Sequence, residues 1–408
     1  MQNNNLKEIQ RRAFQYFQDF SNFNKEENGY GLTPDHSKKQ GIASIAATGF
    51  MLSSLVIGVE QGYIPREKAY EQAIGTLKTL YTNVSHYNGF FAHYVNVKTG
   101  IRHKLSEYST IDTAIALCGV ITIDSYFNQS ELSEIAKNIL DRVNWQDFIH
   151  QKKGKKLLYM AYNPDKEGAY ARGQSGYIHQ WDMFAEQLMM YVIIGGSKYS
   201  EHAKELYEGF DRVFGTYEDL SFIHSPGNAL FIYQFPLAWF DLKNIVDADG
   251  ISWFDNAALA TRAHQKCSIN YQETFKTMNQ YYFGFTASDT PEGYRVYGAL
   301  PNVENKINSD GTIAPFGIIG SLPLTPDIVL PAIARLNEIK GLWGKYGYYD
   351  AFNLENIKPW ISKRYYSLDK GLELLMVNAY LSQDVYHSFM NHPIIVKGME
   401  ALQWEKIK

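Results

Sequence analysis

The sequence predicts an all-α protein, an (α/α)6 barrel in which paired helices form a toroid and long connecting loops carry short β-hairpins. Apolar residues recur at helical spacing through most of the 408 residues. The candidate helices alternate between nearly uncharged ones and ones with a charged face. No linker rich in Pro, Gly or Ser divides the chain, so we expect a single domain, residues 1–408, although this length exceeds that of most single cores.

The alternation is clearest in two consecutive helix pairs. Residues 44–62 are small and apolar, which is typical of a helix buried on all sides, whereas residues 66–82 carry a charged outer face. Residues 109–127 and 131–144 repeat this contrast, as an (α/α)6 barrel requires of each of its hairpins. The expected helices are 5–20, 44–62, 66–82, 109–127, 131–144, 178–194, 199–215, 228–242, 253–277, 312–321, 326–339, 369–384 and 387–400. Short hairpins are expected in the connections 87–102, 155–162 and 281–286.

Two of these helices carry clear start signals. Ser109 to Asp112 has the spacing of a capping box, with the aspartate in the acidic position. Thr325 precedes Pro326, which places a proline at the first helical position, where its missing N–H costs nothing.

The composition narrows the choice of partner. The net charge is −4 and no basic stripe is present, which argues against nucleic acid or an anionic membrane. Aromatic residues make up 15%; most should pack in the core, and some could line a carbohydrate groove, because flat apolar rings with polar rims suit sugars. Cys118 and Cys267 give neither a disulfide framework nor a metal site. No apolar signal region or run of 18 apolar residues is visible, so we expect a cytoplasmic location unless a signal was removed.

The first candidate site residues are Glu107 and Asp112, at the start of the predicted helix 109–127. In a helical toroid the N-termini of the inner helices open into the central cavity, and their positive ends stabilise carboxylates. An equally strong interpretation is structural: Asp112 caps the helix and Glu107 is a solvated loop residue.

Glu186 is the second candidate, a single carboxylate in the apolar run 181–191. A buried carboxylate is normally paired, protonated or directed into a polar cavity, and a raised pKa suits a general acid. By pattern alone, a solvent-facing glutamate on an amphipathic helix is the stronger interpretation. Trp181, in the same run, is a candidate ring for contact with a sugar.

The third candidate region is C-terminal and combines Gly, Asp, Asn and aromatic residues in the segments 285–294, 310–315 and 342–353, the last of which contains Tyr348. Carboxylates and amides bind hydroxyl groups while rings stack on sugars, so together these segments favour a binding surface. Taken singly, each is better explained as turn chemistry. No H-E-x-x-H or Cys/His spacing, P-loop, dinucleotide fingerprint or G-x-S-x-G elbow occurs, so we expect no metal or cofactor, and lone histidines such as His93 should be structural or sugar contacts.

Several motifs together resemble those of one family. They are EYSTIDT at 107–113, GFTASD at 284–289, DGTIAP at 310–315 and DAFN at 350–353, with shorter runs at 10–17, 46–50, 321–323, 342–344, 346–347 and 368–371. With them the chain resembles the bacterial "putative glucoamylase" family of glycoside hydrolases, which includes endo-β-1,2-glucanases, and the likeness extends over nearly the whole sequence. The resemblance implies an (α/α)6 barrel glycosidase that needs no metal, and some domains of the family transglycosylate.

The resemblance also implies residue roles. Glu107, Asp112 and Glu186 look like the central acidic residues of the cleft, with Glu107 and Glu186 as the acid/base pair whose individual roles stay open. Substrate binding is implied for Asp289, Asp310, Trp343 and Asp350.

The chain departs from the family pattern at one helix start, where Asp369-Lys370-Gly371 replaces the expected Asp-Gln-Gly and Glu373 adds an acid. These changes leave endo- or exo-action open, as the sequence does for retention or inversion. The leading hypothesis is a hydrolase of β-1,2-glucan or its oligosaccharides. A transglycosylase, an exo-acting enzyme and a non-catalytic glycan-binding toroid are the alternatives, and the oligomeric state is open.

Overall fold

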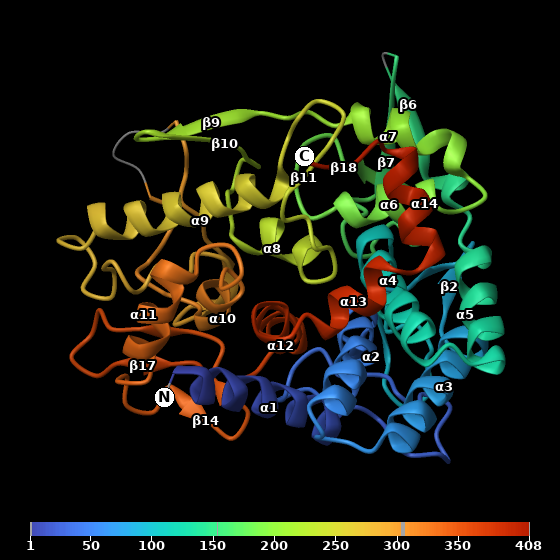
Figure 1. Cartoon of the computed structure of the whole chain (residues 1–408), viewed down its shortest axis with the longest axis horizontal. Helices are drawn as coiled ribbons and strands as arrows, with labels where there is room; N and C mark the ends of the chain where they lie inside the picture. The colour runs from blue at the N-terminus through green and yellow to red at the C-terminus, as the bar shows by residue number, and fades with distance from the viewer. Residues whose placement is uncertain (1, 153, 303–306, 408) are drawn as a thin grey trace.

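The computed structural model describes residues 2–152, 154–302 and 307–407. The chain is mostly helical, as predicted, and its helices are arranged around the middle of the molecule (Figure 1). The α-helices are α1 (Gln2–Phe20), α2 (Ile45–Glu60), α3 (Arg66–Thr82), α4 (Thr110–Phe127), α5 (Ser130–Arg142), α6 (Leu188–Gly195), α7 (Ala203–Gly209), α8 (Phe231–Leu237), α9 (Trp253–Asn270), α10 (Pro315–Ile319), α11 (Pro326–Leu336), α12 (Ser367–Leu381), α13 (Asp384–Met390) and α14 (Pro393–Ala401).

Buried and amphipathic helices alternate along the chain, as the sequence predicts. Helix α2 buries every residue from Ile45 to Gly58, and α4 is buried over most of its length, whereas α3 and α5 each bury one face. Figure 1 shows α4, α8 and α12 toward the middle and α1, α3, α5, α9 and α11 toward the periphery. Helix α4 is long and apolar enough by composition to cross a membrane, but its burial within the protein is that of a core helix.

Two glycines allow a close contact between α2 and α4. A Cβ atom on Gly119 would lie 2.3 Å from the carbonyl oxygen of Gly49, and one on Gly49 would lie 2.4 Å from the carbonyl oxygen of Ile115. Real Cβ atoms do not approach oxygen so closely, so only glycine permits this spacing. The contact brings the starts of α2 and α4 side by side.

Helices α13 and α14 follow the last inner helix and cover the C-terminal ends of α2 and α4. The Gln61 amide at the end of α2 donates to Asp384 of α13 over 3.0 Å, and His392 lies 3.1 Å from Asp124 of α4.

The strands are short, and every pairing between them is antiparallel. The largest sheet places β7 (Lys155–Asn163) against β5 (Tyr108–Ser109), β6 (Ile149–Lys152) and β8 (Gly176–Gln180). The paired two-stranded ribbons are β1 (Ile42–Ser44) with β4 (Tyr94–Asn96), β2 (His86–Tyr87) with β3 (Phe90–Phe91), β9 (Phe214–Tyr217) with β10 (Leu220–Ile223), β11 (Ile245–Val246) with β18 (Glu405–Lys406), β12 (Ala287–Thr290) with β13 (Gly293–Val296), β14 (Trp343–Gly344) with β15 (Gly347–Tyr348), and β16 (Phe352–Asn353) with β17 (Trp360–Ile361). The hairpin pairing expected in 87–102 is confirmed. The hairpin expected in 155–162 is wrong, because these residues all belong to the single strand β7, which pairs with β6.

Two predicted helices are partly wrong because of pairing with β7. The prediction 178–194 includes residues that form β8, and α6 begins only at Leu188. The prediction 199–215 ends early, at Gly209, where the chain packs so closely on β7 that a Cβ would lie 2.0 Å from the Lys156 carbonyl oxygen. Contacts between distant segments override helical periodicity at both places.

Three further boundaries differ from prediction. The expected helix 387–400 is two helices, because Pro393 has no N–H to continue α13 and instead starts α14, where His392 caps the first turn. Helix α9 ends at Asn270, so the predicted segment 271–277 is not helical. Residues 281–286 form turns and extended chain, and the hairpin expected there is wrong.

We predict that Gly49→Ala destabilises the protein by about 1–3 kcal/mol, because the added methyl group must separate α2 from α4, even though alanine favours helix by up to ~1 kcal/mol. Urea unfolding followed by circular dichroism measures this. Gly41→Ala is the matched control, since a Cβ atom there meets nothing within 4 Å. Equal stability of the two variants would contradict the tight contact.

Candidate active site

The starts of the inner helices surround one cavity with a volume of about 600 Å³. This volume is typical of small-molecule sites. The residues that line it at or just before the first turns of α4, α6, α8, α10 and α12 are Ser109, Asp112, Glu186, Phe231, Phe316, Leu368 and Asp369. The positive ends of several helices therefore face the same hollow, which favours negative charge within it.

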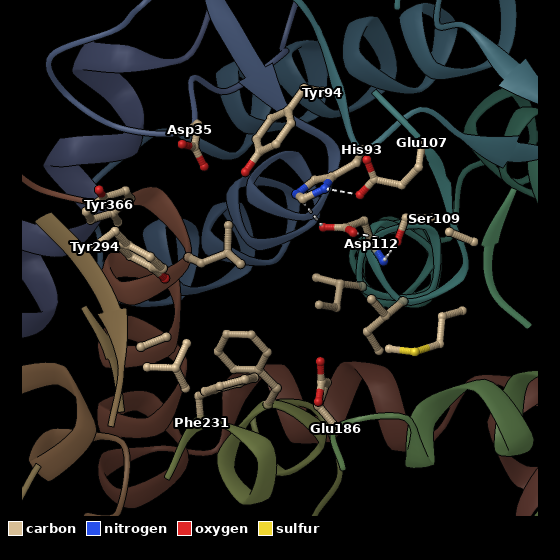
Figure 2. Close-up of a pocket in the computed structure, with 18 of the residues that line it drawn as sticks. Asp35, His93, Tyr94, Glu107, Ser109, Asp112, Glu186, Phe231, Tyr294 and Tyr366 are labelled. Carbon is tan, nitrogen blue, oxygen red and sulfur yellow. Dashed lines mark hydrogen bonds and ion pairs between the residues drawn. The ribbon is translucent and has the colours of Figure 1, made fainter. Parts of the chain in front are cut away.

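One wall of the cavity holds two carboxylates bridged by a histidine (Figure 2). The Nδ1 atom of His93 lies 2.7 Å from Oε1 of Glu107, and its Nε2 atom lies 3.4 Å from Oδ1 of Asp112. Glu107 and Asp112 are 5% and 7% exposed, so the pair would repel strongly without a cation between them. We call His93, Glu107 and Asp112 the acid–histidine cluster.

The protonation of the acid–histidine cluster follows from this geometry. Burial lowers the pKa of His93, but Asp112 and Glu107 outweigh it and raise the pKa to about 9. Burial raises the pKa of Glu107, but the hydrogen bond from His93, the charge of His93 and further hydrogen bonds together outweigh it, so the net pKa is lowered. Burial raises the pKa of Asp112, with the histidine opposing it. At neutral pH the cluster therefore combines an imidazolium with ionised Glu107.

Asp112 is both a cap and a cavity residue, so the two interpretations of the sequence do not exclude each other. The Ser109 hydroxyl accepts from the Asp112 backbone N–H at 3.2 Å and donates to the Asp112 carboxylate at 2.5 Å. The serine thus performs one half of the expected capping box, while the carboxylate turns toward His93 and the hollow (Figure 2).

Glu186 lies across the hollow from the acid–histidine cluster, with its carboxylate directed inward (Figure 2). The expectation that Glu186 interrupts a helix is wrong, because it lies in the loop before Leu188, the first residue of α6. Burial raises the pKa of Glu186 to about 7, and the charge of Asp112 adds to the rise. Trp181 also lines the cavity, and its indole N–H holds this loop to α4 by donating to the Thr110 hydroxyl at 3.0 Å.

Asp289 lies behind the opposite wall of the cavity and not in its lining. Its carboxylate accepts from Arg364 at 3.0 Å, from the Tyr366 hydroxyl at 3.1 Å and from Ser362 at 2.7 Å. Arg364 and Tyr366 do line the cavity. Asp289 therefore positions two residues of the cavity lining, whereas direct contact of Asp289 with the substrate was expected.

Asp350 also lies behind this wall, beside the carboxyl group of Asp369, which was not among the predicted site residues. Its carboxylate accepts from the Asp289 backbone N–H at 2.7 Å, and burial raises its pKa to about 6. Asp369 lines the cavity, and burial together with Asp350 raises its pKa. Like Asp112, Asp369 is an acid in the first turn of an inner helix, and that signal could have identified it.

Three residues expected to bind substrate lie elsewhere. Tyr348 is fully buried and donates to Asn337 at 2.7 Å, and the Trp343 ring packs edge-on against it at 4.7 Å. Asp310 accepts from the Thr312 backbone N–H at 2.8 Å, as a turn residue does. None of the three is in the cavity lining, so packing and turn chemistry explain them better than sugar binding.

Lys370 and Glu373, where the chain departs from the family pattern, compensate each other's charge. The two side chains form an ion pair within α12 and are 1% and 2% exposed, and the Lys370 ammonium also donates to the Tyr348 carbonyl oxygen at 2.8 Å. Neither residue lines the cavity. The two opposite charges offset one another behind the cavity wall, and both act on the neighbouring Asp369.

Comparison with known proteins supports one family. Residues 178–393, more than half of the chain, match the model of the Glycoamylase family, described as "Putative glucoamylase". The matched span contains Glu186 and Asp369, and the acid–histidine cluster precedes it.

One curated relative and two solved structures illustrate the likeness. The chain is 25% identical over 402 residues to an exo β-1,2-glucooligosaccharide sophorohydrolase (non-reducing end) of Parabacteroides distasonis, covering 90% of this chain and 53% of that protein, so it spans about half the relative's length. A putative glucoamylase from Bacteroides uniformis superposes with a TM-score of 0.86 at 24% identity, covering 100% of this chain and 98% of the other. An endo-β-1,2-glucanase from Chitinophaga pinensis, solved with sophorotriose and glucose, gives 0.84 at 20% identity, covering 100% and 99%. At such identities the two structures show the fold alone.

We predict that the stabilising effect of His93 depends on pH. Since its folded pKa is raised to about 9, its contribution should be fully present below about pH 6.5 and be lost as the pH rises through about 9. Urea unfolding of wild type and His93→Gln at about pH 6 and about pH 10 should therefore give a larger stability difference at the lower pH. His387→Gln, at an exposed site on α13, should show no such trend. A difference that grows with pH would contradict the bridged arrangement.

Proposed function

The chain belongs to the "Putative glucoamylase" family, and on that premise we propose that it is a glycoside hydrolase that cleaves β-1,2-linked glucan or its oligosaccharides. The observation that carries the proposal is the pairing of two kinds of carboxyl group in one cavity. Glu186 has a pKa raised to about 7, whereas Glu107 is held ionised by His93. Glycoside hydrolysis needs one protonated and one ionised carboxyl group on either side of the scissile bond.

In the proposed reaction Glu186 is the general acid. Close to neutral pH a substantial fraction of its carboxyl groups carries a proton that can pass to the glycosidic oxygen as the bond to the sugar breaks. Asp112 assists, because its negative charge across the hollow makes loss of that proton less favourable. This arrangement follows a general rule: when the surroundings of two titratable groups push their pKa values apart, one group serves as the acid and the other as the base.

The acid–histidine cluster supplies the second carboxylate and stabilises the positive charge that develops on the sugar ring. His93 sits between Glu107 and Asp112 and lowers their mutual repulsion, so both can remain close to the reacting sugar. The positive end of α4, where Asp112 lies in the first turn, favours the same ionised state. No metal ion is needed for either step.

The proposed linkage rests on the relatives. The Parabacteroides relative is a sophorohydrolase that acts on β-1,2-glucooligosaccharides, and the Chitinophaga structure is an endo-β-1,2-glucanase. This chain corresponds to about half of the Parabacteroides relative. We therefore propose that it cleaves the β-1,2 linkage, and product analysis decides whether it cuts at the end of the glucan or within it.

We further propose that α1 to α12 form a single-domain (α/α)6 toroid of six outer–inner pairs. Helix α1 packs on α12 and α2, and α12 packs on both α10 and α2, so the first and last inner helices are neighbours. This contact is what closure of a ring of helices requires.

We predict that Glu186→Gln lowers kcat on linear β-1,2-glucan by about 10²–10⁴-fold, because the amide cannot donate the catalytic proton. Reducing ends and chromatographic product profiles follow the reaction. Glu134→Gln, at an exposed site on α5, is the matched control and should keep full activity. Release of disaccharide alone would indicate exo-action, mixed lengths endo-action, and longer or cyclic products transglycosylation. Cleavage of only an α-linked glucan by the wild type would refute the linkage, and an active Glu186→Gln would refute the acid role.

The pH profile should have a basic limb set by Glu186. Its protonated form is the active one, so kcat should fall tenfold per unit as the pH rises beyond about 7. Initial rates on linear β-1,2-glucan between about pH 5 and about pH 9 measure this. A rate that stays constant to about pH 9 would be inconsistent with a carboxyl proton donor.

A further inference from the structure

Two tyrosines, Tyr170 and Tyr294, line the cavity, and at least about half of the surface of each is exposed. Tyr170 is 65% exposed and Tyr294 is 52% exposed, and both face the hollow that holds Glu186. Tyrosine in a protein normally covers its ring against neighbours, so rings left open toward a cavity are available to a ligand.

The two tyrosines stand on different walls. Tyr170 lies on the wall of the acid–histidine cluster, because the backbone N–H of its neighbour Ala169 donates at 3.2 Å to the carbonyl oxygen of Leu105, two residues before Glu107. Burial and then the charges of Glu107 and Asp112 raise the pKa of the Tyr170 hydroxyl. The pKa of Tyr294 is raised by its depth in the cavity and then by Asp369 and Asp350, on the opposite wall. A ligand between the walls therefore meets an aromatic ring at each side.

The segment that carries Tyr170 is fixed in place. This loop, residues 164–175, connects β7 to β8. The Asn163 amide donates to the Ala169 carbonyl oxygen at 3.1 Å, and Arg102 forms an ion pair with Asp165 at 2.7 Å. Tyr170 itself has φ of 59°, a conformation that bulky residues rarely adopt. The anchored loop holds the ring toward the cavity at a cost in backbone energy.

Tyr294 is held from behind by the network around Asp289. Tyr294 and Asp289 are directly paired across the β12–β13 hairpin, and Asp289 binds Arg364 and Tyr366. The Tyr366 ring lies 5.3 Å from that of Tyr294 (Figure 2). Val296, two residues along the same strand, lines the cavity on the same face. The hairpin thus presents an apolar platform backed by polar bonds.

We propose that Tyr170 and Tyr294 are specificity-determining residues that stack on the glucosyl units on either side of the scissile bond. The inference rests on the proposed function and assigns the contacts that hold the glucan chain across the acids. Sugar rings have apolar faces of C–H groups, which pack on aromatic rings, and polar edges, which bind the nearby carboxylates and Arg364. Asp289, which does not reach the cavity, then acts as a positioning residue for one of the two platforms.

The test compares Tyr170→Ala, Tyr294→Ala and the conservative variants Tyr170→Phe and Tyr294→Phe on linear β-1,2-glucan. Each alanine variant should raise KM by roughly 5- to 10-fold while kcat changes by less than about threefold, and each phenylalanine variant should restore KM, because the ring rather than the hydroxyl makes the contact. Tyr380→Ala is the control, since Tyr380 is an exposed tyrosine of α12 outside the cavity lining. Thermal unfolding establishes that all variants fold.

Binding without turnover provides the second readout. In the Glu186→Gln background, titration calorimetry with short linear β-1,2-glucooligosaccharides should show weaker binding for both alanine variants and unchanged binding for Tyr380→Ala. Active wild type with unchanged KM and unchanged binding in both alanine variants would overturn the stacking role and leave the hydrolase intact. Wild type that cleaves no β-1,2-glucan would overturn the proposed function and this inference with it.

Discussion

The convergence of inner-helix N-termini on one cavity is the constraint on which the rest of the site depends. Carboxyl groups are expensive to bury, yet Glu107, Asp112, Glu186 and Asp369 all line a hollow inside a largely apolar ring. The positive helix ends and the buried imidazolium of His93 offset part of that cost. Without the imidazolium, burial would raise the pKa of Glu107 as it does that of Glu186, and the difference between acid and base would be smaller.

The two walls of the cavity stabilise closely spaced carboxyl groups in different ways. On one wall a cation stands between Glu107 and Asp112, which keeps Glu107 charged. On the other, Asp350 and Asp369 face each other with raised pKa values, so that a shared proton replaces the cation. Neither arrangement applies to Glu186, and burial raises its pKa to about 7. The position of each group relative to helix ends and cations therefore determines its protonation.

Much of this could be predicted from the sequence, and the failures have physical causes. The alternation of buried and amphipathic helices is a local pattern, so α2 to α5 were predictable to within a few residues. An acid at a predicted helix start pointed to Asp112, which lies in the cavity lining. The β8 strand and the loop position of Glu186 depend on pairing with β7, which no local pattern records. Asp310, Trp343 and Tyr348 lie in loops rich in sugar-binding residue types, and only the three-dimensional packing shows that they lie outside the cavity lining. His93 appeared isolated in sequence because its partners follow it at a distance of more than ten positions.

The buried ion pair of Lys370 and Glu373 constrains how the sequence of α12 can change over evolutionary time. A neutral residue at either position alone would leave the other as an uncompensated charge in the core, at a cost of about 3–5 kcal/mol. Replacing both together can be nearly neutral. Lineages that carry this pair are therefore separated from those with neutral residues by an unstable single-substitution intermediate, and the two positions should be inherited as a unit.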